Sequence, residues 1–489
     1  METKMRWYDH VTINLAWLGL NVASGVITPV MLPYLVALFV PPALKNTYLA
    51  QIRVVSLAMA MLVQPLSGTL SDRNTSSWGR RRPYILGGTL FDLLFLVLVG
   101  SSVLFIDNTA LDNIFEPIFG VGSAYVILMV GIVLLQISSN VAHGALQGLI
   151  PDLVPKDQRG RASGVKAVME LLPAFMVIFV GPLVDAGKIW LTVSIIAGSL
   201  LITTLGTVLS VREVPLKEKP SEPIRERVLR LVALTVIFVG VTRGAVWLVG
   251  SSGDWLTQRQ APVEIQVALV GLAGLLGMAG SIILGVYFGA WMGIGQEARQ
   301  QRSFIWWVVN RLLFLAAVGS IQGFAQFFLS DVLEIPNPAT VTTLLTAVVG
   351  VFLMPSALGG GYLADRIGRQ RLVALSGLIA AGGTILLLFS KNVPMVIISG
   401  CIIGLATGTF FATNWALGTD LAPRKEAGRY LGISNLAGAG AGIVGAGIGG
   451  PMADFFNALD PGLGYLVIFA LYAALFVLST LTLTQVQAK

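Results

Sequence analysis

Two loops of this chain concentrate aspartate and arginine between long apolar runs. The first, "SGTLSDRNTSSWGRRRP", places Asp72 and Arg73 a few residues before Arg80. The second, "GGYLADRIGRQR", repeats the Asp-Arg pair at Asp365. An aspartate interacts favourably with the positive end of a helix, and arginine forms charge-assisted bonds to carboxylates or lipid phosphates. The chemistry expected here is therefore reversible ion pairing that holds one side of the molecule closed.

A duplicated segment supplies carboxylates that could pair with these arginines. "PDLVPKDQRGRASGV" at 151–165 returns as "TDLAPRKEAGRYLGI" at 419–433, at an offset of 268. The alternative, that the arginines only set membrane topology, weighs more for Arg81 and Arg82 than for Asp72. The predicted gating residues are Gly68, Asp72, Arg73, Gly79, Arg80, Asp152, Arg161, Asp365, Arg366, Gly368, Arg369, Asp420 and Arg429.

Ionisable residues inside the apolar runs form a second group. They are costly in a membrane, so each is a candidate for function. Glu170 is the first candidate to carry a proton, and an ion pair with Lys166, one turn earlier, is the structural alternative. His143 is the second, with hydrogen bonding across a helix pair as its alternative. Asp92 is the third, where structural pairing is favoured.

Polar uncharged side chains beside aromatic rings suit a hydroxyl-bearing ligand, because hydroxyls need directional donors and acceptors. Arg311 could bind an anionic or hydroxyl-bearing ligand, or pair structurally. We expect Arg53 to snorkel to the outer surface and Arg243 to serve a structural or lipid-binding role. The candidate ligand-binding residues are Asn21, Asn140, Gln147, Arg311, Gln322, Gln326, Asn414 and Trp415.

The runs that carry these residues are too apolar for a soluble domain. Of the 489 residues, 55% are hydrophobic and 12% are charged, and the mean hydropathy is +0.80. A helix needs about 20 apolar residues to span a membrane, and the runs are continuous rather than alternating. A helical bundle is therefore predicted, with fourteen spans at 11–40, 48–71, 83–106, 121–150, 161–185, 189–211, 228–250, 264–291, 303–330, 340–364, 372–390, 393–418, 427–454 and 463–484.

The net charge of +7 is distributed between alternate loops. With the N-terminus inside, most of the 32 Lys and Arg residues fall in cytoplasmic segments, as the positive-inside rule requires. This orientation predicts cytoplasmic termini in the plasma (inner) membrane, and it removes nucleic-acid binding as the reason for the charge. One cysteine and two histidines predict neither a disulfide nor a metal site. No cofactor is expected, because "GAGIVG" at 440–445 follows no strand.

Internal repeats divide the chain into two similar halves. The Asp-Arg loops recur at an offset of 293, which starts the second half near residue 304 and makes the spans at 228–250 and 264–291 an insertion. Two similar bundles can expose a central site to each side in turn. The predicted parts are an N-terminal six-helix bundle (1–211), a cytoplasmic linker (212–227), an inserted two-helix hairpin (228–302) and a C-terminal six-helix bundle (303–489).

The paired loops resemble the signature loop of the major facilitator superfamily. Five residues separate Asp-Arg from Gly-Arg in the first copy, which is similar to the plant sucrose/proton symporters and their relatives in the glycoside-pentoside-hexuronide group. The segment "NVAHGALQGLIPDL" at 140–153 carries the same resemblance. Asn140, which cannot titrate, stands where that motif has a proton-carrying aspartate. The inserted helices depart from the 12-helix plan and resemble the 14-helix drug exporters and peptide transporters.

The resemblance implies a major facilitator fold, all-α and integral to the membrane, that moves a small solute by alternating access. A sugar or glycoside is the leading expectation, with proton coupling as an option. The alternative is a proton-driven exporter of amphipathic compounds. Enzyme activity is not expected, since no nucleophile–base or metal constellation is visible. The expected partners are the solute, membrane lipids and, in a coupled mechanism, protons, and we expect a monomer. Substrate, direction, coupling ion and the role of the inserted helices stay open.

Overall fold

The computed structural model describes residues 5–213, 215–216, 224–295, 301–421 and 427–487, without the side chains of 227, 293, 294 and 427–437. Across these residues the chain is helix and turn, with no strand, which confirms the all-α prediction. Here 13 helices are long and apolar enough to cross a membrane. Helix α18 (Ala427–Leu459) lies at the remaining predicted span. The predicted pattern of spans therefore agrees with the helices.

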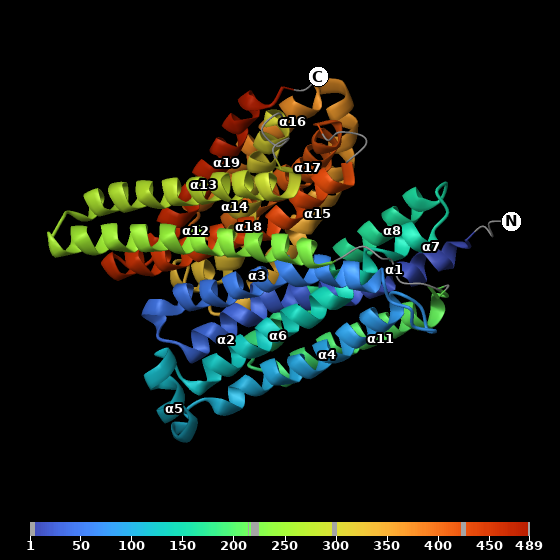
Figure 1. Ribbon diagram of the computed structural model, residues 1–489. Helices are drawn as coiled ribbons and strands as arrows, with labels where there is room; N and C mark the ends of the chain where they lie inside the picture. The colour runs from blue at the N-terminus through green and yellow to red at the C-terminus, as the bar shows by residue number, and fades with distance from the viewer. Residues whose placement is uncertain (1–4, 214, 217–223, 296–300, 422–426, 488–489) are drawn as a thin grey trace. The chain divides into compact units, whose positions relative to one another are not determined.

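The first of two compact units comprises residues 1–40 and 59–228. It contains the second half of α3 (Lys45–Ser71), with α1 (Trp7–Val26), α2 (Leu32–Phe39), α4 (Arg82–Ser101), α5 (Thr109–Phe119), α6 (Ser123–Leu146), α7 (Leu149–Leu153), α8 (Arg159–Leu171), α9 (Pro173–Met176), α10 (Gly181–Asp185) and α11 (Ile189–Ser210). Helix α4 packs between α6 and α11, and α1 packs against α8 and α11 (Figure 1). The helices that carry the candidate residues of the first half are thus neighbours.

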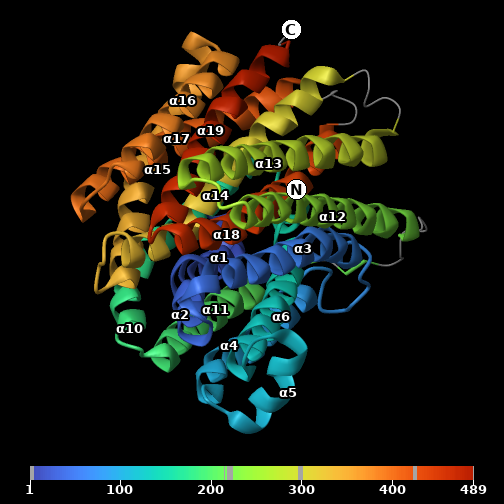
Figure 2. The ribbon, with the colours of Figure 1, turned by 90° about the vertical axis from the view of Figure 1, so that its left-hand side faces the viewer.

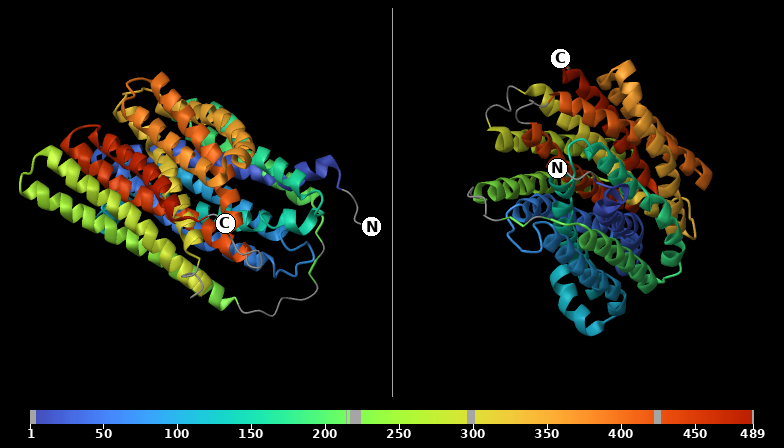
Figure 3. Two further views of the ribbon diagram at one scale, coloured as in Figure 1. Left: turned by 90° about the horizontal axis from the view of Figure 1, so that it is seen from above. Right: turned by 90° about the vertical axis from the view of Figure 1, so that its right-hand side faces the viewer.

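The second unit comprises residues 41–58 and 229–489, and so includes the first half of α3. Its other helices are α12 (Arg225–Gln258), α13 (Val263–Ile294), α14 (Arg302–Asp331), α15 (Pro338–Ile367), α16 (Arg369–Leu388), α17 (Val393–Leu421), α18 and α19 (Leu463–Thr482). Helix α17 packs against α15 and α16, and α14 packs against α18 and α19 (Figure 2). Helices α12 and α13, at the place of the predicted insertion, form a hairpin, and α13 packs against α18 (Figure 3).

Two predicted spans of the first unit are interrupted rather than continuous. The first passes through a π-helical turn, Ile27–Met31, between α1 and α2. The fifth is divided into α8, α9 and α10, and both later pieces carry a proline at their first or second position. Proline lacks a backbone N–H and clashes with the preceding turn, so it ends the helix before it.

The short helix α5 lies outside the predicted spans, since it has only 11 residues. Asn108 caps its start by accepting a bond from the Leu111 backbone N–H at 3.2 Å. Asp112 Oδ1 accepts from the Ser123 backbone N–H at 2.7 Å, and this bond lowers the pKa of Asp112. The aspartate thereby fixes the start of α6.

Close helix crossings in the second unit depend on glycines. A Cβ on Gly408 of α17 would lie 2.2 Å from the Leu353 backbone oxygen of α15. A Cβ on Gly404 would lie 2.8 Å from the Val349 backbone oxygen. Since backbone cannot yield as a flexible side chain can, these two glycines set the distance between α15 and α17.

We expect Gly408→Ala to lower the stability of the folded protein by about 1–3 kcal/mol, because the added methyl group overlaps backbone. Thermal unfolding of the purified protein in detergent measures the loss. Gly382→Ala on α16 is the matched control, since a Cβ there meets nothing within 4 Å. Equal melting temperatures for the two variants would contradict the packing argument.

Candidate functional site

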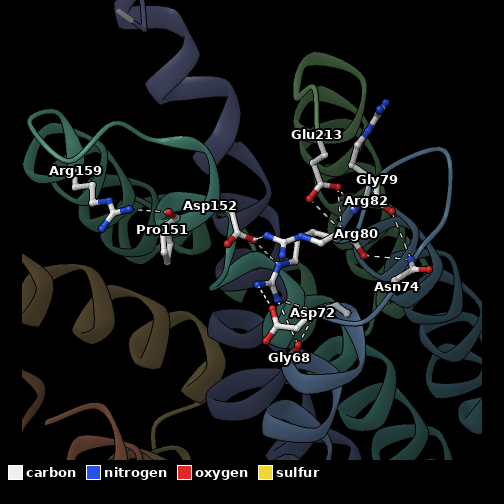
Figure 4. Close-up of polar contacts among 12 residues, drawn as sticks. Gly68, Asp72, Asn74, Gly79, Arg80, Arg82, Pro151, Asp152, Arg159 and Glu213 are labelled. Atoms are coloured by element: carbon white, nitrogen blue, oxygen red, sulfur yellow. Dashed lines mark hydrogen bonds and ion pairs between the residues drawn. The ribbon is translucent and has the colours of Figure 1, made fainter. Parts of the chain in front are cut away.

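Arg81 is the centre of the first ion-pair cluster, formed by Asp72, Arg80, Arg81 and Asp152. Its Nε donates to Asp152 Oδ2 at 3.0 Å, its Nη1 donates to Ser71 Oγ at 2.7 Å, and its Nη2 is paired with Asp72. Arg80 Nη2 also reaches Asp152 Oδ2, at 2.7 Å (Figure 4). The guanidinium therefore ties the end of α3 and the start of α4 to α7. This pairing favours a structural or gating role for Arg81 over the topological one.

The surroundings of Arg81 are shaped to admit it. Its side chain is only 6% exposed. A Cβ on Gly148 would lie 2.1 Å from Arg81 Cζ, so the guanidinium occupies the space of the missing side chain. Glycine at this position of the "GLIPDL" segment is thus a packing requirement.

Glu213 caps the start of α4 and was not singled out by the sequence. Its Oε2 accepts from the backbone N–H groups of Arg81 at 2.9 Å and Arg82 at 3.0 Å. A carboxylate at the first turn of a helix satisfies unpaired donors and interacts well with the helix dipole. Gly79 has φ +116°, and a Cβ there would lie 2.4 Å from Glu213 Oε2. A glycine is therefore needed at position 79 for two reasons: the positive φ angle disfavours other residues, and a side chain would collide with Glu213.

The second ion-pair cluster, Asp365, Arg369 and Asp420, is more exposed. Arg369 Nη1 is paired with Asp420, and its Nη2 lies 3.9 Å from Asp365 Oδ1. The side chains of Arg369 and Asp420 are 36% and 56% exposed, so this pairing is expected to be weaker. Gly368 has φ +96° at the turn between α15 and α16.

The other predicted gating residues are placed in different ways. Arg366 donates to the Tyr362 hydroxyl and stacks on its ring at 4.5 Å. Arg161 is exposed and makes no bond to the described residues, whereas Arg159 Nη2 donates to the Pro151 backbone oxygen at 2.8 Å. Gly68 is half-buried, and its backbone oxygen accepts from Arg81 Nη1 at 3.4 Å. Arg73 is half-buried. The side chain of Arg429 lies outside the described residues.

A polar cluster within the spans of the first unit joins α1, α6 and α8. Lys166 Nζ lies 4.0 Å from the centroid of the Trp17 ring and 3.3 Å from Glu170 Oε1. The rings of Trp17 and His143 meet edge to face at 4.9 Å. Two proton candidates, Glu170 and His143, are thus brought together around one tryptophan. Lys166 thus contacts an acid and an aromatic ring at the same time.

The other polar candidates of the first unit are placed less favourably. Asn140 is buried and donates to the Gln136 backbone oxygen of its own helix at 2.8 Å. Asn21 is half-buried and donates to the Trp17 backbone oxygen at 2.8 Å. Gln147 is exposed. Asp92 is 1% exposed and accepts a bond from Ser138, so it joins α4 to α6 as the structural alternative expects.

The second unit holds an arginine cluster of its own. Arg311 Nη1 donates to Asn414 Oδ1 at 3.2 Å, and its guanidinium carbon lies 5.1 Å from the centroid of Trp415. Gln326 is buried and Gln322 is exposed, both on α14. Of the five candidate ligand-binding residues in this unit, three are therefore in contact: Arg311, Asn414 and Trp415.

The start of α3 is held by acids that the sequence did not identify. Asp454 Oδ2 accepts from the Thr47 backbone N–H at 2.7 Å, and its Oδ1 accepts from Asn46 Nδ2 at 2.8 Å. Asp331 Oδ1 lies 2.6 Å from Lys45 Nζ, and its Oδ2 accepts from the Tyr465 hydroxyl at 2.5 Å. Five side chains meet here, and we call them the α3-start cluster: Lys45, Asn46, Asp331, Asp454 and Tyr465. In the sequence, "GPLVD" at 181–185 returns as "GPMAD" at 450–454, which ends in Asp454, and this repeat is a signal that could have found it.

The expectation that Arg53 snorkels to the surface is wrong. The side chain is 9% exposed, and its Nη2 donates to the Gly319 backbone oxygen of α14 at 2.9 Å. A Cβ on Gly323 would lie 1.4 Å from Arg53 Nη1, so this glycine admits the guanidinium. Arg243, by contrast, is exposed on α12.

These features define an all-α integral membrane protein with no group of three or more potential metal ligands among its described residues. Models of known families match both parts of the chain. The Major Facilitator Superfamily model matches residues 312–487, and the MFS/sugar transport protein model matches residues 13–239. The chain belongs to the major facilitator superfamily.

Relatives and solved structures agree with this assignment. The minor myo-inositol transporter of Bacillus subtilis is 35% identical over 20% of this chain and 22% of that protein. A sucrose transport protein of Oryza sativa subsp. japonica is 37% identical over 22% of this chain and 20% of that protein. The chain thus aligns with about a fifth of the length of these relatives. The D-xylose-proton symporter structure shares the fold, with TM-score 0.61 and 16% identity over 97% of this chain and 96% of that one.

We expect Arg81→Gln to lower stability by on the order of 2 kcal/mol, because two carboxylates lose a nearly buried partner. Arg302→Gln, on an exposed side chain at the start of α14, is the control and should change stability little. Thermal unfolding in detergent compares the two, and solute uptake by the same variants in liposomes tests gating. If both variants melt and transport alike, Arg81 does not hold the cluster together.

We expect Asp454→Ala to cost about 1 kcal/mol, since the first backbone N–H groups of α3 lose their cap. Asp460→Ala is the control, because Asp460 is exposed at the end of α18. The melting temperature measures both. A loss no larger than that of the control would mean that water replaces the cap without cost.

Proposed function

We propose that this protein is a secondary active transporter of a small polyhydroxylated solute, of the sugar or glycoside class, working by alternating access. The observation that carries the proposal is the first ion-pair cluster, in which one buried arginine ties three helix ends through reversible bonds. The solute class is supported by relatives named for myo-inositol and sucrose transport. The exporter alternative has no comparable support among these relatives.

Ion pairs suit a gate because they form and break without covalent chemistry. Arg81, Asp72 and Asp152 would hold α3, α4 and α7 together while the cytoplasmic side is closed. The α3-start cluster would hold the other end of α3 against α14, α18 and α19. Helix α3 contributes residues to both compact units. Movement of its start would require the α3-start cluster to break, and movement of its end would require the first ion-pair cluster to break.

Coupling to protons, in this proposal, uses Glu170. Its carboxylate pairs with Lys166, which also contacts Trp17. A proton on Glu170 would remove the ion pair and leave Lys166 with the ring of Trp17 alone. The arrangement of α1 relative to α8 would then depend on protonation. His143, in contact with the same tryptophan, is the second candidate, and Asp92 is the third.

The remaining assignments are proposals of the same kind. The distribution of Lys and Arg supports cytoplasmic termini and the plasma (inner) membrane of the cell. We retain the division into 1–211, 212–227, 228–302 and 303–489 for the functional parts. We propose a monomer, surrounded by lipid, that takes its solute without a nucleic-acid partner.

A liposome assay with the purified protein and a pH-sensitive dye tests the transport proposal. On addition of a sugar panel, the wild type is expected to move solute and protons together, whereas Glu170→Gln should exchange solute across the membrane without net proton flux. Glu116→Gln, exposed on α5, is the matched control. Proton flux that survives Glu170→Gln would reject Glu170 as the carrier. Absence of movement for every solute tested would contradict the transporter proposal itself.

A further inference from the structure

Arg311 is a cation within a membrane span for which the described residues offer no acid. Its bonds are one hydrogen bond to Asn414 and the stacking contact with Trp415. In the sequence, α14 and α17 carry acids only at Asp331 and Asp420, and α19 carries none. Asp331 is paired with Lys45, and Asp420 is paired with Arg369. Among the described residues, the positive charge of Arg311 therefore has no counter-charge, in a place where charge is costly.

A chain of hydrogen bonds fixes which atoms face Arg311. Asn310 Nδ2 donates to the backbone oxygen of Ser479 at 2.7 Å, and a carbonyl can only accept. Asn310 Oδ1 must then face Asn414, whose Nδ2 donates to it at 2.8 Å. Asn414 Oδ1 is left to accept from Arg311, which can only donate. One backbone carbonyl thus determines the orientation of both amides.

This chain of bonds is rigid because its members are buried. Asn310 and Asn414 are 0% exposed, and Ser479 is 1% exposed. Trp307 Nε1 donates to the Asn414 backbone oxygen at 2.9 Å, and a Cβ on Gly418 would lie 2.1 Å from the Trp307 ring. The site is built before any ligand arrives, which reduces the ordering that binding would require.

Within the described part of the chain, the contacts leave the Nε donor of Arg311 unsatisfied. Nη1 is used by Asn414, whereas Nε is buried and makes no bond to the described residues. Nε and Nη2 form the planar fork that matches the two oxygens of a carboxylate. Trp415, half-buried beneath the guanidinium, offers an aromatic face on which a sugar ring can lie.

We propose that Arg311 binds a carboxylate of the transported solute, so that the substrate is a sugar acid rather than a neutral sugar. This inference rests on the proposed transport function and narrows its substrate class. The ligand would supply the counter-charge that α14, α17 and α19 lack at this depth. Trp415 would contact the ring, and Asn414 would hold the fork in position.

The test compares sugars that differ only at the group that Arg311 would bind. D-glucuronate and D-glucose share a ring and differ in one carboxylate, as do D-galacturonate and D-galactose. Thermal shift in detergent measures their binding to the wild type, and uptake into liposomes measures their transport. We expect at least one acid to bind the wild type tenfold or more tightly than its neutral parent.

Three variants separate charge, geometry and folding. Arg311→Gln should reduce the tenfold preference to less than about twofold, while Arg311→Lys, which keeps the charge without the fork, should recover only part of it. Arg302→Gln, exposed on the same helix, is the control and should keep the full preference. Melting temperatures without ligand show whether each variant is folded, and Arg311→Lys carries the test if Arg311→Gln is not.

The possible outcomes distinguish this inference from the transport proposal. A wild type that binds and transports neutral sugars as well as their acids overturns the role of Arg311 while leaving the transporter intact. A preference for acids that survives Arg311→Gln also overturns it. A wild type that neither binds nor transports any of the four sugars contradicts the proposed function and the inference with it.

Discussion

A charged side chain among membrane-spanning helices must be given partners by the protein, because lipid supplies none. Three arginines of this chain meet that requirement in different ways. Arg81 has two carboxylates and a hydroxyl, whereas Arg53 has a backbone oxygen. Arg311 has an amide and a tryptophan ring. Each of these arginines bonds to a group on another helix, so each one also links two helices.

The Asp-Arg motif occurs in both halves of the chain, but its ion pairs differ in burial. In the first half, Arg81 is nearly buried, and its bonds join three helix ends. In the second half, Arg369 occupies an exposed turn and reaches only Asp420 closely. The difference lies partly in Arg81, which enters the space beside Gly148. Repetition of the motif therefore does not imply equal burial of the ion pairs that it forms.

Much of the fold could be predicted from the sequence, because span length and hydropathy are local properties. The helices end near the predicted limits, and Lys166 and Glu170 pair as their spacing of one turn suggested. The partners of Arg53, Glu213 and Asp454 could not be predicted in this way. Each bonds to a segment far away in the chain, and nothing in the local composition indicates which backbone group will be near.

The same limit on local information explains the wrong expectation for Arg53 and the unexpected burial of Arg81. Arg53 lies near the end of an apolar run, where snorkelling costs little, yet a glycine on α14 makes burial possible. Arg81 lies in a run of three arginines that suits the positive-inside rule, yet its side chain is nearly buried. In both cases the decisive feature is the space offered by a neighbouring helix.

Glycines beside buried charges have a consequence for the divergence of related sequences. Arg81 occupies the position of a side chain at Gly148, and Arg53 does the same at Gly323. Neither residue of such a pair can change freely while the other is kept, because a larger residue at the glycine would displace the guanidinium. Across descendants of this protein, each arginine and its glycine should be kept or lost together. Substitutions at the two positions of a pair are therefore expected to be correlated.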